Sequence, residues 1–270
     1  MEGVETYLSG IVASHRQAAS LDTRSLDAVL ALAVSSRPPR GFAQSISAHE
    51  GLSLIAEVKR ASPSLGPLVP HLDPAALAVD YRDGGASCCS VLTDEQYFNG
   101  SADDLKLVAA TVALPVLRKD FTVSALDVAD ARVMGADAVL LIAAVLSDEE
   151  LTTFAQLAHD LDLDVLVEVH DEPELERALK LEVAMVGVNQ RDLVTFNIDT
   201  ERALRLASSI PPSVLAIAES GIRGADDANS MASAGFSAIL VGEILVKASD
   251  RVAATRALVG APIRRRVDVR

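Results

Sequence analysis

The chain has 270 residues, of which 50% are hydrophobic and 23% are charged, so it can bury a large core and is neither disordered nor fibrous. Its length exceeds that of one small domain, but barrels built from repeated strands and helices reach this size around a single core. The formal net charge of −14 argues against nucleic acid as a partner, because an acidic surface repels a phosphate backbone.

The first 50 residues predict a helical extension ahead of the main fold. Residues 1–10 are partly acidic and lack an apolar centre, so we expect no secretory signal and a cytoplasmic protein. Apolar spacing predicts helices over residues 4–19 and around 26–34, and prolines interrupt the pattern within 37–40. We expect this extension to lie over one end of the barrel predicted below, as a lid.

After residue 50, eight short apolar or β-branched runs alternate with amphipathic stretches. The runs predict strands at residues 54–59, 87–92, 115–119, 138–142, 165–169, 185–189, 214–219 and 238–241. The amphipathic stretches predict helices at residues 74–82, 102–110, 125–134, 148–161, 172–180, 200–207, 225–234 and 249–258. Several strands are continuously apolar, which is typical of a parallel sheet covered by helices.

The repeat of eight strand–helix units indicates the fold class. Eight units in roughly 200 residues match an α/β fold of the (β/α)8 TIM barrel type, here with an N-terminal helical extension. A doubly wound sheet fits less well, because it usually has fewer strands and no G-x-G-x-x-G follows the first predicted strand. We predict one domain over residues 1–270, in which residues 1–50 form the extension and residues 51–260 the barrel.

Two further features indicate the protein's surroundings. The longest apolar run, residues 138–146, is much shorter than the roughly 20 residues that cross a bilayer as a helix, so no membrane contact is expected. The two cysteines, Cys88 and Cys89, are adjacent, which suits thiols on opposite faces of a strand better than a disulfide. This pattern favours a reducing compartment.

Polar side chains gather where the predicted strands end, and catalytic groups in such barrels come from the carboxyl ends of the strands. Glu57 and Lys59 are two residues apart on a strand, so both point into the barrel. Alone, this pair also fits a structural ion pair. The strand ends together supply two lysines, three carboxylates, an asparagine and an arginine: Glu57, Lys59, Lys119, Glu168, Asn189, Arg191 and Glu219. Such a collection at one mouth indicates an active site.

Small residues follow the last two predicted strands. Ser220 and Gly221 follow the seventh strand, and Gly242 and Glu243 follow the eighth. Barrels of this type bind phosphate at that place through backbone N–H groups. Each glycine alone also fits an ordinary turn. Their pairing on the last two strands favours a phosphate site.

The other candidate residues are assigned no role. His71 and His170 have no second histidine or cysteine at metal-binding spacing, so no metal is expected. The three arginines at positions 264–266 form a short basic tail, and such tails are usually only solvated.

Seven segments of the chain resemble one known family. They are residues 55–64 (IAEVKRASPS), 93–98 (TDEQYF), 117–121 (LRKDF), 166–170 (LVEVH), 188–193 (VNQRDL), 218–222 (AESGI) and 241–243 (VGE). These segments are similar to those of the indole-3-glycerol phosphate synthase family of tryptophan biosynthesis. They follow the family's order across nearly the whole chain.

The resemblance implies a (β/α)8 barrel that converts 1-(2-carboxyphenylamino)-1-deoxyribulose 5-phosphate into indole-3-glycerol phosphate, carbon dioxide and water, with no metal and no organic cofactor. Lys119 is the expected general acid of ring closure. Glu168 is the expected acid or base of the later proton transfers, supported by Lys59 and Glu57. The expected partner is a phosphorylated small molecule, and the protein is expected to be a monomer or a weak homo-oligomer.

By the same resemblance, the family's site residues fall on matching positions of this chain. The implied catalytic residues are Glu57, Lys59, Lys119, Glu168, Asn189, Glu219 and Ser220. The implied substrate-binding residues are Ser62, Phe98, Phe121 and Arg191. The implied phosphate-binding residues are Lys59, Ser220, Gly221, Gly242 and Glu243.

Four positions depart from the family's usual pattern. Leu65 stands where many members have lysine, and Asn99 stands where many have glycine. Gln190 replaces a frequent asparagine, and Ile244 replaces serine or alanine. None of the four removes a catalytic group, so we expect them to affect turnover and affinity rather than the type of reaction.

Two alternative functions stay open at this point. One is a different phosphate-binding barrel enzyme, such as a sugar-phosphate isomerase, which would not need Lys59, Lys119 and Glu168 together. The other is a non-catalytic paralogue that keeps the fold for binding or scaffolding. Such a descendant usually loses a proton-transfer residue, whereas this sequence retains all of them.

Overall fold

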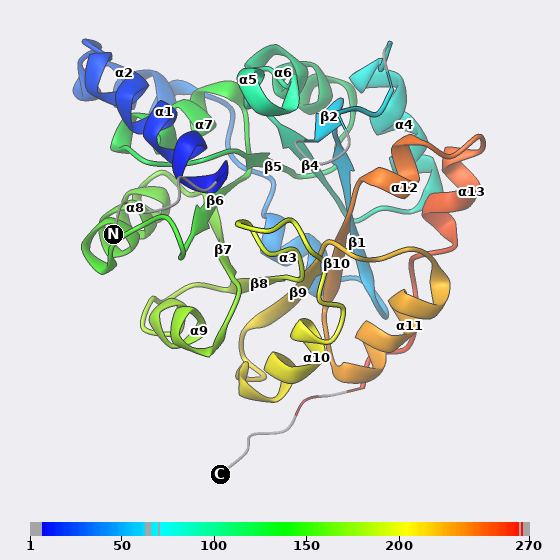
Figure 1. The fold of residues 1–270 in the computed structure, drawn as a ribbon. Helices are drawn as coiled ribbons and strands as arrows, with labels where there is room; N and C mark the ends of the chain where they lie inside the picture. Colours follow the sequence, from blue (N-terminus) through cyan, green and yellow to red (C-terminus); the bar gives the residue numbers. More distant parts are fainter. Residues whose placement is uncertain (1–6, 63–65, 70, 265, 267–270) are drawn as a thin grey trace.

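The main body of the protein is a closed barrel of parallel strands. The computed structural model describes residues 7–62, 66–69, 71–264 and 266. Within them the barrel strands are β1 (Ser53–Val58), β4 (Cys88–Leu92), β5 (Val116–Lys119), β6 (Ala138–Ile142), β7 (Asp164–Val169), β8 (Met185–Asn189), β9 (Leu215–Glu219) and β10 (Ala238–Val241). They pair in the order β1, β10, β9, β8, β7, β6, β5, β4, and β4 pairs with β1 to close the ring (Figure 1). The predicted fold class is confirmed, and each predicted strand end lies within one residue of the observed one.

Helices follow the strands and pack around the barrel (Figure 1). The outer helices are α4 (Pro74–Gly84), α6 (Ala102–Thr111), α7 (Ala125–Met134), α8 (Asp148–Asp160), α9 (Glu172–Ala178), α10 (Arg202–Leu206), α11 (Ala225–Ala234) and α13 (Arg251–Arg256). The loops add α5 (Glu95–Phe98), α12 (Glu243–Val246), the 3-10 turn η1 (Ala207–Ser209) and a small antiparallel pair, β2 (Ala61–Ser62) with β3 (Gly66–Pro67). Across the described part of the chain, no helix combines the length and apolar character that crossing a membrane requires.

The core has two apolar layers, one inside the barrel and one between the strands and the outer helices. Because side chains alternate along a strand, Cys88 faces the inner layer and Cys89 the outer one. Both thiols are buried and free, so the predicted placement on opposite faces is confirmed. The outer layer packs residues such as Val139 and Val186 against the helices, which explains why the strands are continuously apolar.

The N-terminal extension contacts both ends of the barrel. It forms α1 (Tyr7–Leu21), α2 (Leu26–Ser35) and α3 (Phe42–Ser47). At the carboxyl end of the strands, Ile11 of α1 joins the inner apolar layer, while α2 packs against α7. At the other end, the buried Phe42 of α3 enters the same layer, and Ser45 Oγ donates to the carbonyl of Ser87 just before β4. The extension was expected to lie over one end of the barrel only, whereas α1 and α3 contact opposite ends.

A buried aspartate anchors the linker between α2 and α3. Asp137 immediately precedes β6 and has no exposed surface. Its Oδ1 lies 2.9 Å from Arg37 Nη1. The same carboxylate accepts hydrogen bonds from the backbone N–H groups of Arg40 and Val116. One side chain thus joins the linker to two adjacent strands of the barrel.

We expect Asp137→Ala to lower the free energy of unfolding by about 2–4 kcal/mol, because a guanidinium and two buried N–H groups lose their acceptor. Urea denaturation followed by circular dichroism measures the change. Asp103→Ala is the control, because it removes an exposed surface pair with Lys106 and should cost little. Equal losses in the two variants would contradict the anchoring role.

Candidate active site

A cavity of about 240 Å³ opens at the carboxyl ends of the barrel strands. All the site residues named from the sequence line it: Glu57, Lys59, Ser62, Phe98, Lys119, Phe121, Glu168, Asn189, Arg191, Glu219, Ser220, Gly221, Gly242 and Glu243. Ile244, one of the departures from the family pattern, also lines it, whereas Leu65 lies outside the described residues. The fold therefore brings together side chains that separate strands and loops supply.

The centre of the cavity holds a lysine between two carboxylates, which we call the Lys–Glu–Glu cluster: Lys119 of β5, Glu168 of β7 and Glu219 of β9. Lys119 Nζ lies 3.0 Å from Glu168 Oε2 and 3.7 Å from Glu219 Oε2. Both carboxylates are only 1% exposed. Water therefore screens these charges weakly, and each strongly affects the protonation of its neighbours.

Burial and mutual charge set different protonation states within the Lys–Glu–Glu cluster. Burial lowers the pKa of Lys119, but the negative charges of Glu168, Glu219 and Glu57 outweigh it and raise that pKa above its ordinary value. Burial raises the pKa of Glu168, but the charges of Lys119 and His170 and the hydrogen bonds from Asn189 and Lys119 together outweigh it and hold that pKa well below its usual range. Burial and the charge of Glu168 raise the pKa of Glu219 far above its usual value. These shifts favour a charged lysine and an ionised Glu168, and they favour the protonated form of Glu219 over its ionised form.

Two neighbours orient Glu168. Asn189 Nδ2 donates to Glu168 Oε1 over 3.1 Å. His170 Nε2 lies 3.6 Å from the same oxygen, and His170 Nδ1 lies 3.0 Å from Glu174 Oε2. His170 was considered above only as a metal ligand, and this contact was not expected. His170 directly follows β7, two residues after Glu168, and side chains two apart along an extended chain share a face.

Two glycines leave room for the carboxylates of the cavity. A Cβ added at Gly187 on β8 would overlap Glu219 Oε1. A Cβ added at Gly242 would lie 2.7 Å from Glu57 Oε1. The sequence analysis missed Gly187, because a glycine inside a strand does not reveal which distant side chain passes over it. Gly242 was expected only as part of a phosphate loop, and it also makes space for Glu57.

One side of the cavity is an aromatic wall formed by Phe98, at the end of α5, and Phe121, after β5. Their ring centroids are 6.5 Å apart. Lys59 Nζ lies 5.6 Å from the centroid of Phe98 and 3.5 Å from Glu57 Oε1. The expected Glu57–Lys59 pair is thus present, and its lysine also faces the wall. Flat apolar rings beside a cation suit a ligand that is both aromatic and anionic.

Helix α1 contributes lining residues that the sequence analysis did not single out. Tyr7, Leu8 and Ile11 all line the cavity. The ring of Tyr7 meets the edges of Tyr97 and Phe196, with centroids 5.8 Å and 5.1 Å away. No local sequence signal identifies these residues, because their place depends on how α1 packs on the barrel.

The opposite side of the cavity carries two loops on neighbouring strands. Ser220 and Gly221 follow β9, and Gly242 and Glu243 follow β10. Glu243 is the first residue of α12, and Lys247 directly follows that helix. Glu243 Oε1 lies 2.8 Å from Lys247 Nζ. A carboxylate repels phosphate, so Glu243 suits a phosphate only through its backbone N–H.

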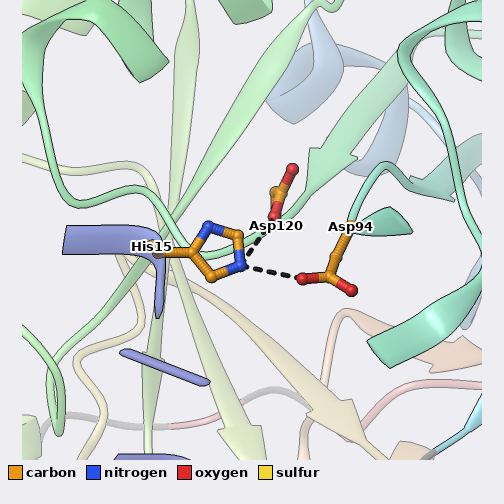
Figure 2. Close-up of side chains that lie close together, drawn as sticks. All are labelled: His15, Asp94 and Asp120. Carbon is orange, nitrogen blue, oxygen red and sulfur yellow. Dashed lines mark hydrogen bonds and ion pairs between the residues drawn. The ribbon is translucent and has the colours of Figure 1, made fainter. Parts of the chain in front are cut away.

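A polar cluster ties α1 to the cavity. His15 points from α1 toward two carboxylates, with Nε2 2.8 Å from Asp94 Oδ2 and 3.9 Å from Asp120 Oδ1 (Figure 2). Each of the three offers one atom that could bind a metal ion. However, Arg118 Nη2 lies 3.0 Å from Asp120 Oδ2, and its charge disfavours a cation there. A protonated His15 supplies the positive charge instead, and the expectation of no metal stays a prediction.

We expect the attachment of α1 to weaken at alkaline pH. Burial lowers the pKa of His15, but the hydrogen bond to Asp94 and the charge of Asp120 outweigh it and raise that pKa above its ordinary value. A raised folded-state pKa means that the stabilisation is complete below the unfolded-state pKa of about 6.5 and is lost as pH rises through the folded-state value. His15→Gln should therefore lower the free energy of unfolding on the order of 1 kcal/mol at acidic pH and much less at alkaline pH.

Urea denaturation of both proteins, at a pH about one unit below 6.5 and again above pH 8, measures this difference. His159→Gln, at an exposed position on α8, is the control and should show little change at either pH. A loss for His15→Gln that is the same at both pH values would show that its charge is unimportant.

Comparison with known proteins places the chain in a family. The family model for indole-3-glycerol phosphate synthase matches residues 8–258. The chain belongs to the indole-3-glycerol phosphate synthase family. The resemblance stated from the sequence is thereby confirmed. Its members are carboxy-lyases of tryptophan biosynthesis, and the chain is an enzyme of this class.

Individual relatives align with this chain over most of their length. The indole-3-glycerol phosphate synthase of Chlorobium luteolum is 46% identical over 241 residues, covering 88% of this chain and 92% of the relative. The Rhodopirellula baltica enzyme is 44% identical over 255 residues, covering 94% and 98%. The Mycobacterium ulcerans enzyme is 47% identical over 229 residues, covering 85% and 84%. In each case the agreement extends along most of both chains.

A solved structure of a differently named enzyme shares only the fold. Thiamine phosphate pyrophosphorylase from Pyrococcus furiosus matches with a TM-score of 0.57 and 17% identity. The match covers 77% of this chain and 93% of that chain. Barrels of this kind support many reactions, so the likeness says nothing further about chemistry.

Proposed function

We propose that this chain converts 1-(2-carboxyphenylamino)-1-deoxyribulose 5-phosphate into indole-3-glycerol phosphate, carbon dioxide and water. The observation that carries the proposal is the Lys–Glu–Glu cluster, in which Lys119 Nζ lies 3.0 Å from Glu168, whose pKa is lowered, and 3.7 Å from Glu219, whose pKa is raised. The reaction needs proton donors and a proton acceptor around one small framework. The names of the relatives support the same assignment.

Ring closure joins the ring carbon that carries the carboxylate to the ketone carbon of the sugar chain. Negative charge develops on the ketone oxygen, which becomes a hydroxyl by taking a proton. We assign this proton to Lys119, because the surrounding glutamates keep it charged. Loss of carbon dioxide then returns the electrons of the broken C–C bond to the ring.

The new hydroxyl next leaves as water, which needs a second proton, and a proton on carbon is removed to complete the indole. We assign the removal to Glu168, which is ionised in the free site. Glu219, which is protonated, is a second donor within the same cluster. In total the enzyme gives two protons to oxygen atoms of the substrate and removes one proton from carbon. The net uptake of one proton balances the negative charge of the carboxylate, which leaves as neutral carbon dioxide.

The walls of the cavity match the two ends of this substrate. We assign the anthranilate ring to the aromatic wall of Phe98 and Phe121, with Arg191 and Ser62 toward its carboxylate. The phosphate is assigned to the loops after β9 and β10, which offer backbone N–H groups and glycines. Both ends of the substrate are anionic, so cations in the mouth of an otherwise acidic protein favour its capture.

A continuous fluorescence assay for indole-3-glycerol phosphate in the presence of EDTA tests the proposal. We expect turnover in EDTA, and we expect Lys119→Ala to lower its rate by about 10³-fold. Substrate binding without turnover in the unsubstituted protein would instead indicate the non-catalytic paralogue. Turnover that EDTA removes would contradict the expectation of a metal-free reaction.

We further infer that the enzyme acts in the cytoplasm as a single domain over residues 1–270, and as a monomer or a weak homo-oligomer. The two buried free thiols support a reducing compartment. Size-exclusion chromatography with light scattering across a range of concentrations measures the oligomeric state. A stable oligomer at the lowest concentration would contradict the inference of a monomer or a weak homo-oligomer.

A further inference from the structure

The turn after β9 has an unusual backbone. Ser220 has a φ of +64° and Gly221 a φ of +74°, so two consecutive residues occupy the left-handed region. Residues with a side chain rarely adopt this conformation, and serine is not among those that favour it. At Gly221 an added Cβ would also lie 2.8 Å from Ile198 Cγ2. Something outside the turn must therefore stabilise the conformation of Ser220.

The side chain of Gln190 makes that contact. Gln190 follows β8, and β8 is the neighbour of β9 in the barrel (Figure 1). The side chain of Gln190 is buried, with the residue only 1% exposed. Its Nε2 donates to the carbonyl oxygen of Ser220 over 2.8 Å. Its own backbone is fixed on both sides, because its N–H donates to the Glu219 carbonyl and its carbonyl accepts from the Asp199 N–H. The donor is thus held rigidly beside the turn.

This hydrogen bond determines where the next N–H points. In a trans peptide the C=O and the N–H point in opposite directions, and the described residues contain no cis peptide bond. The Ser220 carbonyl points toward Gln190, which is not among the described residues that line the cavity. The N–H of Gly221 therefore points away from Gln190, and Gly221 does line the cavity.

The Gly221 N–H is also available to a ligand. Within the part of the chain that the structure describes, this N–H has no hydrogen-bond acceptor. Glycine permits the preceding peptide to rotate into other turn conformations, which would turn the Ser220 carbonyl toward the cavity. A carbonyl oxygen there would repel an anion, whereas an N–H binds one.

We propose that Gln190 is a positioning residue that holds the Ser220–Gly221 peptide with its N–H toward the phosphate of the substrate. This inference rests on the proposed function, which places the phosphate at this loop. Gln190 does not itself touch the substrate. It acts through the hydrogen bond that keeps the carbonyl of Ser220 turned away from the anion.

Gln190→Met tests the role, because methionine has nearly the same length and volume but cannot donate to Ser220. Calorimetric titration of the full chain with inorganic phosphate and, separately, with anthranilate probes the two ends of the cavity. We expect the Kd for phosphate to rise about 10-fold, which corresponds to about 1.4 kcal/mol, and the Kd for anthranilate to stay unchanged. With the phosphorylated substrate, KM should rise similarly and kcat should stay within about threefold, since the lost contact binds ground state and transition state alike.

Gln156→Met is the matched control, because Gln156 is exposed on α8 and its Nε2 donates only to Asp160. It should leave both Kd values unchanged. An unchanged phosphate Kd in Gln190→Met would overturn the inference. Equal losses for phosphate and anthranilate would also overturn it, because they would indicate general loosening of the cavity.

The same titrations separate this inference from the proposed function. If the unsubstituted protein binds phosphate but does not convert the substrate, the proposed reaction fails while the comparison of phosphate affinities still decides the role of Gln190. If the unsubstituted protein converts the substrate and Gln190→Met binds phosphate equally well, only the inference fails. If the unsubstituted protein binds no phosphate, the assignment of the loop fails and the inference fails with it.

Discussion

Lys119→Ala should lower kcat by about 10³-fold while changing KM by less than about threefold. The reason is that its proton is needed when charge develops on the ketone oxygen, and little before then. Steady-state kinetics in the fluorescence assay measure both constants. A KM that rises by as much as kcat/KM falls would show that Lys119 only binds substrate.

Two further variants separate proton donation from charge. Lys119→Arg keeps a positive charge beside Glu168, but arginine gives up its proton far less readily than lysine. It should therefore leave kcat low, and recovery of kcat would refute the general-acid role. Lys106→Ala is the matched control, because Lys106 lies on the surface in α6 and pairs only with Asp103. Its kinetics should equal those of the unsubstituted protein.

Glu168→Gln should lower kcat by about 10²-fold or more and leave substrate affinity nearly intact, because the site loses its proton acceptor. It should also change the pH dependence. The charge of Glu168 helps to raise the pKa of Lys119, so its removal lowers that pKa. The lysine then loses its proton at lower pH, and the alkaline fall in the remaining activity should move to lower pH than in the unsubstituted protein.

Measuring kcat against pH for both proteins tests this expectation, and an alkaline limb that does not move would contradict the coupling between Glu168 and Lys119.

Glu219→Gln gives a comparison for Glu168→Gln. Burial and the charge of Glu168 favour the protonated form of Glu219, so this change alters the charge of the cluster less and should cost less than Glu168→Gln. Glu176→Gln, at an exposed position on α9, is the control and should leave kcat unchanged.

The barrel and the charged groups of the candidate active site at its strand ends could be predicted from local patterns. Continuously apolar strands between amphipathic helices indicate a parallel sheet, and the carboxyl ends of parallel barrel strands meet at one mouth. For this reason Lys119, Glu168 and Glu219 could be expected together although they lie on different strands. The parity of side chains along a strand likewise placed Glu57 with Lys59, and Cys88 opposite Cys89.

The different protonation of chemically identical side chains could not be predicted in this way. Glu168 and Glu219 both end barrel strands, and nothing in their neighbouring residues distinguishes an ionised carboxylate from a protonated one. The difference comes from distances of 3.0 Å and 3.7 Å to one lysine and from Asn189 and His170, which contact Glu168, in a site where both carboxylates are almost completely buried. These quantities exist only in the folded chain, since a local sequence pattern contains no distances between strands.

The amino-acid sequence by itself determined the eight barrel strands, the main outer helices, their order and the set of polar residues at the strand ends. Only the tertiary structure decided that α1 and α3 contact opposite ends of the barrel, that His15 meets Asp94, and that Gln190 orients Ser220. The physical reason is the range of the interactions. Periodicity and helix capping act within a few residues, whereas these contacts join segments far apart in the chain and depend on how whole elements pack.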